Sequence, residues 1–170
     1  MSARNLGRLA PAALVLCVLA GCYETEQEVG PRADSKVDAR FVGDWEFPNP
    51  SAGSTIVRVR NINNREYYIE MGKVGEANPY RGSAYTAAVN GATFAHVREL
   101  AADGSIPAKH TLMRVALTPE GRLELRHLNG NFFQGKDVST SAKLRAVVQQ
   151  NVANHAMYEP QTSTGAKLVK

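Results

Sequence analysis

The sequence predicts a mainly β protein, an antiparallel meander or small barrel of about seven or eight strands with a C-terminal helix packed on it. Three observations favour this fold. Short segments rich in Val, Ile, Tyr, Phe and Thr recur at intervals of about ten residues. Asn, Gly and Pro separate these segments. After Gly135 the apolar residues instead recur at helical spacing.

The apolar segments predict seven strands, each bounded by residues that favour turns. The strongest turn signal is Asn90-Gly91, because a two-residue type I′ hairpin needs a positive φ at both positions. The other breaks contain Asn, Asp, Gly or Pro. The predicted strands span 42–47, 54–60, 66–72, 84–89, 92–100, 109–118 and 122–128.

The first long hairpin has apolar and charged patterns that agree on which side chains share a face. Pairing Arg60 with Glu66 places opposite charges across from each other on one face. The apolar side chains of both strands then lie on the other face, and a slip of one residue would expose all of them to water. This apolar set is Val57, Val59, Tyr67, Ile69 and Met71.

The segments flanking the strands differ in composition from them. Residues 22–38 contain five acids and two bases but few large apolar groups. We therefore expect Cys22 to be followed by a flexible acidic tether that extends to residue 38. The β domain is expected over 39–158 and includes a helix near 140–154, which Ser and Thr can cap. Residues 159–170, rich in Ser and Thr with one Pro and one Gly, are expected to form a disordered tail.

The N-terminus has the three parts of a secretory signal peptide over residues 1–21. Arg4 and Arg8 precede an apolar run over 9–20, which is too short to span a membrane as a helix. Cleavage after residue 21 would remove Cys17 and leave Cys22 as the remaining cysteine. That excludes a disulfide framework and a cysteine metal site within the mature chain.

The tetrad Leu19-Ala20-Gly21-Cys22 resembles the lipobox of bacterial lipoproteins. The resemblance implies that Cys22 is acylated, that the chain is cut before it, and that two or three acyl chains anchor the protein firmly in a membrane. In enterobacterial lipoproteins an Asp after the cysteine often retains the protein at the inner membrane. Tyr23 stands here instead, so the resemblance favours the periplasmic face of the outer membrane.

The first predicted strand opens with Gly43-Asp44-Trp45, a Gly-x-Trp motif that resembles the start of lipocalins and the wider calycin group. The resemblance implies an eight-stranded barrel in which Gly43 and Trp45 form the structural signature of the first strand. It also implies that the indole closes one end of the barrel beneath a basic side chain, here Arg122 or Arg126. Seven strands are predicted where that family has eight.

A lipocalin-like barrel could hold one small amphiphile among inward-facing apolar side chains. The alternative is a filled, non-catalytic module that docks on an envelope complex or a periplasmic enzyme. Copurifying lipid would distinguish the first hypothesis from the second. The residues expected to line the ligand site are Tyr67, Ile69, Met71, Phe94, Met113 and Val115.

Catalytic, metal and nucleic-acid sites are not expected. The sequence lacks a nucleophile elbow, a phosphate-binding glycine loop and the His-Glu-x-x-His motif. A row of His96, Met113 and His127 could bind a soft metal in one register, but half-buried histidines are favoured. Two arginines of the signal peptide supply half of the net charge of +4, so the mature protein is near neutral and we expect no nucleic-acid partner and no cofactor.

Overall fold

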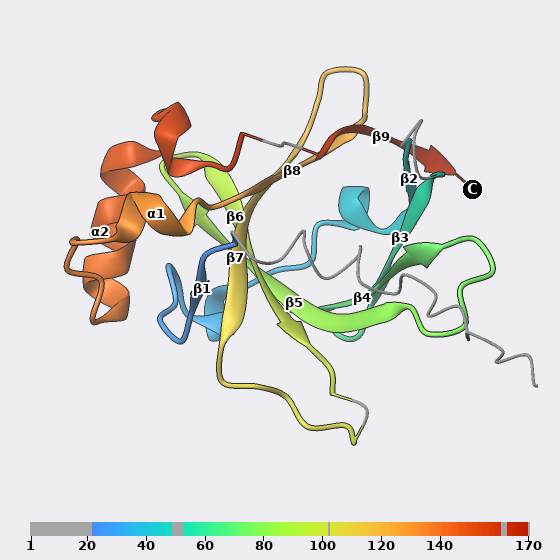
Figure 1. The fold of residues 1–170 in the computed structure, drawn as a ribbon, viewed down its shortest axis with the longest axis horizontal. Helices are drawn as coiled ribbons and strands as arrows, with labels where there is room; N and C mark the ends of the chain where they lie inside the picture. Colours follow the sequence, from blue (N-terminus) through green and yellow to red (C-terminus); the bar gives the residue numbers. More distant parts are fainter. Residues whose placement is uncertain (1–21, 49–52, 102, 161–162, 170) are drawn as a thin grey trace, which may run out of the picture.

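The computed structural model describes residues 22–48, 53–101, 103–160 and 163–169. Within these ranges the strands form one antiparallel sheet, and the C-terminal helices α1 and α2 lie outside it (Figure 1). The strands are β1 (Glu24–Thr25), β2 (Gly43–Phe47), β3 (Thr55–Asn61), β4 (Tyr67–Lys73), β5 (Tyr80–Val89), β6 (Ala92–Glu99), β7 (His110–Leu117), β8 (Leu123–His127) and β9 (Ser163–Val169). The helices are η3 (Arg32–Asp34), η4 (Ala39–Phe41), α1 (Gly130–Phe133), α2 (Ser141–Asn151) and η5 (His155–Met157).

Eight of the strands close into a barrel, which confirms the predicted fold class. From β2 to β8 each strand pairs with the next one along the chain, and β9 pairs with both β2 and β8. The strands are staggered around the barrel: a path that follows the paired residues once around the ring ends on β2 about twelve residues from its starting residue. A stagger of this size corresponds to strands tilted by roughly 45° to the barrel axis. The short β1 pairs with the first two residues of β7, which β8 does not reach.

The eighth barrel strand comes from the segment that the sequence predicts to be a disordered tail. That prediction is wrong over Ser163–Val169, which form β9. Its composition is poor for a strand, and Gly165 has a positive φ of 79°. The strand forms because it satisfies two open edges at once, pairing Leu168 with Trp45 and Ala166 with Leu123.

The β3–β4 hairpin keeps the predicted faces but not the predicted register. Arg58 lies opposite Glu70, and their side chains form an ion pair at 2.7 Å. Arg60 instead forms an ion pair with Asp44 on β2, and Glu66 pairs with Arg32. The true register is shifted by two residues, because the loop between the strands spans 62–66 instead of the expected 61–65. A shift of two preserves the side-chain alternation, so the apolar set still faces inward.

The β5–β6 turn and the helix α2 form as predicted. Asn90 and Gly91 have φ values of 47° and 75°, the positive angles of a type I′ turn. The side chain of Thr140 accepts a hydrogen bond from the backbone N–H of Lys143 and caps α2. The Asn90 side-chain amide donates to the carbonyl of Gln149 at 2.8 Å, which ties the hairpin to the helix.

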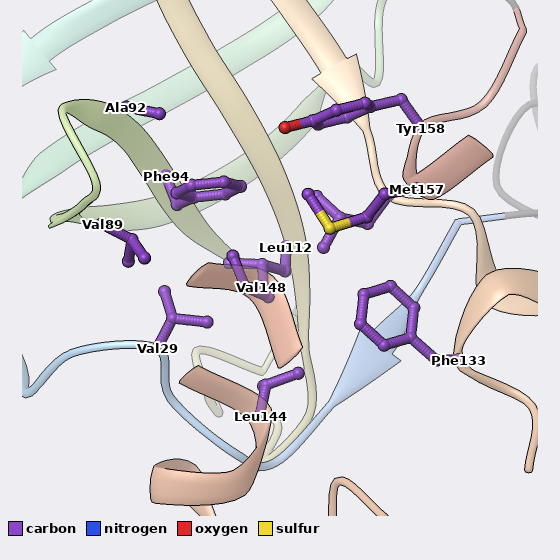
Figure 2. Packing of buried hydrophobic residues seen from close by; sticks show 11 residues of the cluster. Val29, Val89, Ala92, Phe94, Leu112, Phe133, Leu144, Val148, Met157 and Tyr158 are labelled. Carbon is purple, nitrogen blue, oxygen red and sulfur yellow. The ribbon is translucent and has the colours of Figure 1, made fainter. Parts of the chain in front are cut away.

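Two separate apolar clusters stabilise the protein, one inside the barrel and one on its outer wall. The inner cluster contains Trp45, Val57, Val59, Tyr67 and other inward-facing side chains. The outer cluster lies between the strands and the helices, as Figure 2 shows. It includes Val29, Val89, Ala92, Phe94, Leu112, Leu128, Phe133, Leu144, Val148, Met157 and Tyr158.

The residues expected to form a flexible tether are instead packed along the barrel. Within 22–38, Val29 is 0% exposed in the outer cluster. The buried Ser35 hydroxyl donates to the carbonyl of Arg65 in the β3–β4 loop and accepts from the backbone N–H of Thr86 on β5. The acids that suggested a tether are solvent-facing or paired, as Glu28 is with Arg98. The expectation was wrong because a few well-placed apolar side chains suffice when an existing wall receives them.

Candidate functional site

The barrel interior brings together five of the six side chains predicted to line a ligand site. Tyr67 and Val115 are buried in the inner cluster, and the half-buried Ile69, Met71 and Met113 pack against it. Pairing of Val57 with Met71 and of Val59 with Ile69 aligns them across β3 and β4. These side chains share the inward face because each strand alternates with a period of two.

Phe94 does not face the barrel interior, so its assignment to the ligand site is wrong. It is fully buried in the outer cluster, beneath α2 and beside Leu112 (Figure 2). Ala95 and Val97 are the inward-facing residues of β6. Both faces of β6 are apolar because helices and the N-terminal segment cover its outer side, so its sequence does not indicate which face is inside.

One end of the barrel is closed by its own side chains. Trp45 is 2% exposed, and its indole N–H donates to the carbonyl of Phe41 in η4 at 2.8 Å. The hydroxyl of Tyr67 accepts from the backbone N–H of Asp38 at 2.6 Å. A methyl group at Gly43 would clash with the side chain of Leu168 on β9. Glycine at this position therefore leaves room for that side chain next to β2. These side chains fill the barrel interior at this end.

The basic partner that the lipocalin resemblance implies for the tryptophan is not at that position. Among the described residues, the Arg126 guanidinium lies over the ring of Tyr158, 6.0 Å from its centroid. The side chain of Arg122 lies beside Gly165 on β9. In this barrel the carbonyl of Phe41 therefore satisfies the Trp45 indole.

Toward the opposite end of the barrel, several inward-facing side chains are partly exposed. Ile69, Met71, Met113 and Leu125 are inward-facing but half-buried. Polar groups surround them at the rim. Tyr80 lies opposite Met71, and burial, with the carboxylates of Glu99 and Glu24, raises the pKa of Tyr80 to about 12. The mouth thus combines an apolar floor with hydrogen-bonding groups, as small-molecule sites do.

Cys22 lies at the rim of this same mouth. Its residue forms a β-bridge with Asn129, and its sulfur is 3.3 Å from Nδ1 of His127, which pairs with Met113. Burial, and then the charges of Glu159 and Glu24, raise the pKa of the Cys22 thiol. A nucleophilic cysteine has a lowered pKa, so this environment does not activate the sulfur.

His96 and His110 form a buried pair on the outer wall of the barrel, which the sequence did not predict. Nδ1 of His96 is 2.7 Å from Nε2 of His110, and Tyr85 stacks on His96 with ring centroids 4.4 Å apart. His96 pairs with Leu112 and not with Met113, so the predicted row of His96, Met113 and His127 does not form. In the described part of the chain, no group of three or more His, Cys, Asp or Glu is arranged to hold a metal ion.

Two open clefts lie away from the barrel mouth. One of about 540 Å³ is bounded by η3 and the β3–β4 loop and is lined by Arg32, Asn63 and Arg65 among others. A smaller one of about 180 Å³ lies beside η4, between Arg40 and Arg114. Neither contains a residue set with an evident chemical role. The mouth remains the better candidate site.

The comparisons with known proteins leave the fold to be judged from its topology. No protein-family model, no curated protein and no solved structure matches this chain at a significant level. Over the residues that the structure describes, no helix is both long and apolar enough to cross a bilayer. The strand pairing forms a small closed β-barrel, which is consistent with a lipocalin-like fold.

Proposed function

We propose that this chain is a bacterial lipoprotein, anchored through an acylated Cys22 at the periplasmic face of the outer membrane, whose barrel binds a small amphiphile through its open end. The lipobox Leu19-Ala20-Gly21-Cys22 supports the anchor. The half-buried apolar side chains on the inner face beyond Trp45, which are Ile69, Met71 and Met113, support the ligand. Their partial exposure is the observation on which the proposal depends.

The shape of the mouth limits the ligand to a short apolar group with a polar head. The apolar part would contact Ile69, Met71 and Met113, and the filled layer around Trp45 and Tyr67 stops it from reaching further. A polar head would remain at the rim. An eight-stranded barrel has space for about one small ligand.

The alternative is a non-catalytic module that docks on an envelope complex or a periplasmic enzyme. The observation in its favour is the filled half of the barrel, where the side chains from Trp45 to Tyr67 form a core rather than a cavity. A docking module would keep its function when the mouth is blocked, whereas a carrier would lose it. Blocking the mouth therefore separates the two functions.

The anchor and the ligand are tested by separate experiments. Labelled palmitate should enter the wild-type chain and not Cys22→Ala, and the variant should leave the membrane fraction. Ligand binding is measured on Cys22→Ser protein with a fluorescent fatty acid. Met113→Trp should weaken binding at least tenfold by filling the mouth, while Ile62→Trp, on the exposed β3–β4 loop at the other end, should not. Equal binding by both variants would contradict the carrier function.

A further inference from the structure

The topology places several chain segments at the open end of the barrel. In an up-and-down barrel, alternate loops lie at the same end. The β4–β5 loop (74–79) and the β6–β7 loop (100–109) therefore share one end, together with the end of β8 at His127. Figure 1 shows both loops projecting beyond the strands. This is the end at which Cys22 contacts His127.

The residue that follows Cys22 is fixed directly to the barrel wall by backbone hydrogen bonds. The backbone N–H of Tyr23 donates to the carbonyl of Leu128 at 3.0 Å, and the N–H of Leu112 donates to the carbonyl of Tyr23 at 3.3 Å. The Tyr23 ring also stacks on Phe133 with centroids 4.1 Å apart. A group attached to Cys22 is thus held at the barrel mouth, because the next residue is already fixed.

The two loops at this end each present an exposed aliphatic side chain. Val74 is 78% exposed and Ile106 is 50% exposed, the first on the β4–β5 loop and the second on the β6–β7 loop. These loops and the strand ends from which they start carry a net charge of −1, from Lys73, Glu76, Glu99, Asp103 and Lys109. Because this charge is small, we expect a surface that recognises these loops to do so mainly through apolar contact.

Building on the proposed acylation of Cys22, we propose that the open end of the barrel lies directly on the lipid bilayer, with Val74 and Ile106 inserted at its surface. The acyl chains and the two aliphatic side chains then define a plane that contains the mouth. An amphiphile exchanges between the bilayer and the Met113 pocket without crossing bulk water. The opposite end, closed by Trp45, faces the periplasm.

The test uses the acylated protein in vesicles of neutral phosphatidylcholine. An environment-sensitive fluorophore is attached to a single introduced thiol in Val74→Cys, Ile106→Cys or Ile62→Cys, while the acylated Cys22 sulfur cannot react. Ile62 is the matched control, because it is also aliphatic and 53% exposed but lies on the β3–β4 loop at the closed end. Lipids carrying a quencher on the acyl chain report contact with the bilayer.

We expect the fluorophore to be quenched at least threefold more at positions 74 and 106 than at position 62. A Gly/Ser insertion of about ten residues between Cys22 and Tyr23 should remove most of that difference. Equal quenching at all three positions in a protein shown to carry acyl groups overturns this inference alone. If mass spectrometry finds no acyl group on residue 22, the proposed anchor fails, and this orientation fails with it.

Discussion

The buried histidine pair predicts that the protein loses stability in mild acid. His96 is 0% exposed, and it shares one short hydrogen bond with His110 beneath the ring of Tyr85. The side chains of Arg98 and Glu28 are the charged groups that face this pair. Adding a proton to His96 would place a cation in a buried position beside a guanidinium, which the folded state resists.

The size of the effect follows from the pKa of His96. Burial, and then His110 and Arg98, lower that pKa from 6.5 to about 3. As the pH falls below 6.5, His96 therefore binds a proton in the unfolded chain but stays neutral in the folded protein. The free energy of unfolding then decreases with falling pH, from about pH 6.5 until pH 3 is approached. Between pH 7 and pH 4.5 the loss amounts to roughly 2–3 kcal/mol. Burial lowers the pKa of His110 as well, which adds a loss of the same sign.

The assay is urea unfolding of Cys22→Ser protein at pH 7 and at pH 4.5. The quantity compared is the difference between the two free energies of unfolding, because His96→Gln also changes the stability at pH 7. We expect this difference to shrink by about 2 kcal/mol in His96→Gln. In the control variant His155→Gln, which replaces an exposed histidine on η5, the difference should equal that of the Cys22→Ser protein. An undiminished acid loss in His96→Gln would refute the reasoning.

Three further predictions concern the closed end and the closing strand. Trp45→Ala should lower the free energy of unfolding by roughly 3–5 kcal/mol in urea titrations, because it removes the largest inner side chain and leaves the Phe41 carbonyl unpaired; a loss below 1 kcal/mol would contradict a filled end. Gly43→Ala should lower it by about 1–3 kcal/mol, since Gly43 has a φ of 152°, and an unchanged denaturation midpoint would contradict that strain. Removal of residues 163–170 should abolish cooperative unfolding and cause aggregation, measured by circular dichroism and light scattering, because β2 and β8 lose their shared partner; a monomeric, cooperatively folding product would show that closure is dispensable.

The alternation of apolar and polar residues predicted most of the inner face, because this pattern does not depend on the exact register between strands. The β3–β4 register was wrong by two residues, yet Ile69 and Met71 lie inside the barrel as expected. A pattern of period two survives an even shift. Five of the six predicted lining residues could therefore be identified without knowing the true pairing.

The pattern failed where tertiary contacts cover both faces of a strand. On β6, Phe94 and Ala95 are both buried, one against α2 and the other inside the barrel. Nothing local distinguishes the two faces, since the covering helix lies far along the chain. The same holds for His96 and His110, which are brought together only by the pairing of β6 with β7.

The termini were mispredicted because their order comes from distant partners. Residues 22–38 are acidic and Ser163–Val169 have weak strand propensity, and composition alone favours disorder for both. The barrel supplies what they lack, an apolar wall for Val29 and two open strand edges for β9. Such contacts depend on the finished fold and leave no local signature.

The position of β9 also determines when the protein can finish folding. The strand pairs with β2, which begins some 120 residues earlier in the sequence. Until the residues of β9 have been synthesised, β2 and β8 therefore remain exposed edges, open to association with other chains. A chaperone that masks strand edges would have to cover these two strands until residue 163 becomes available.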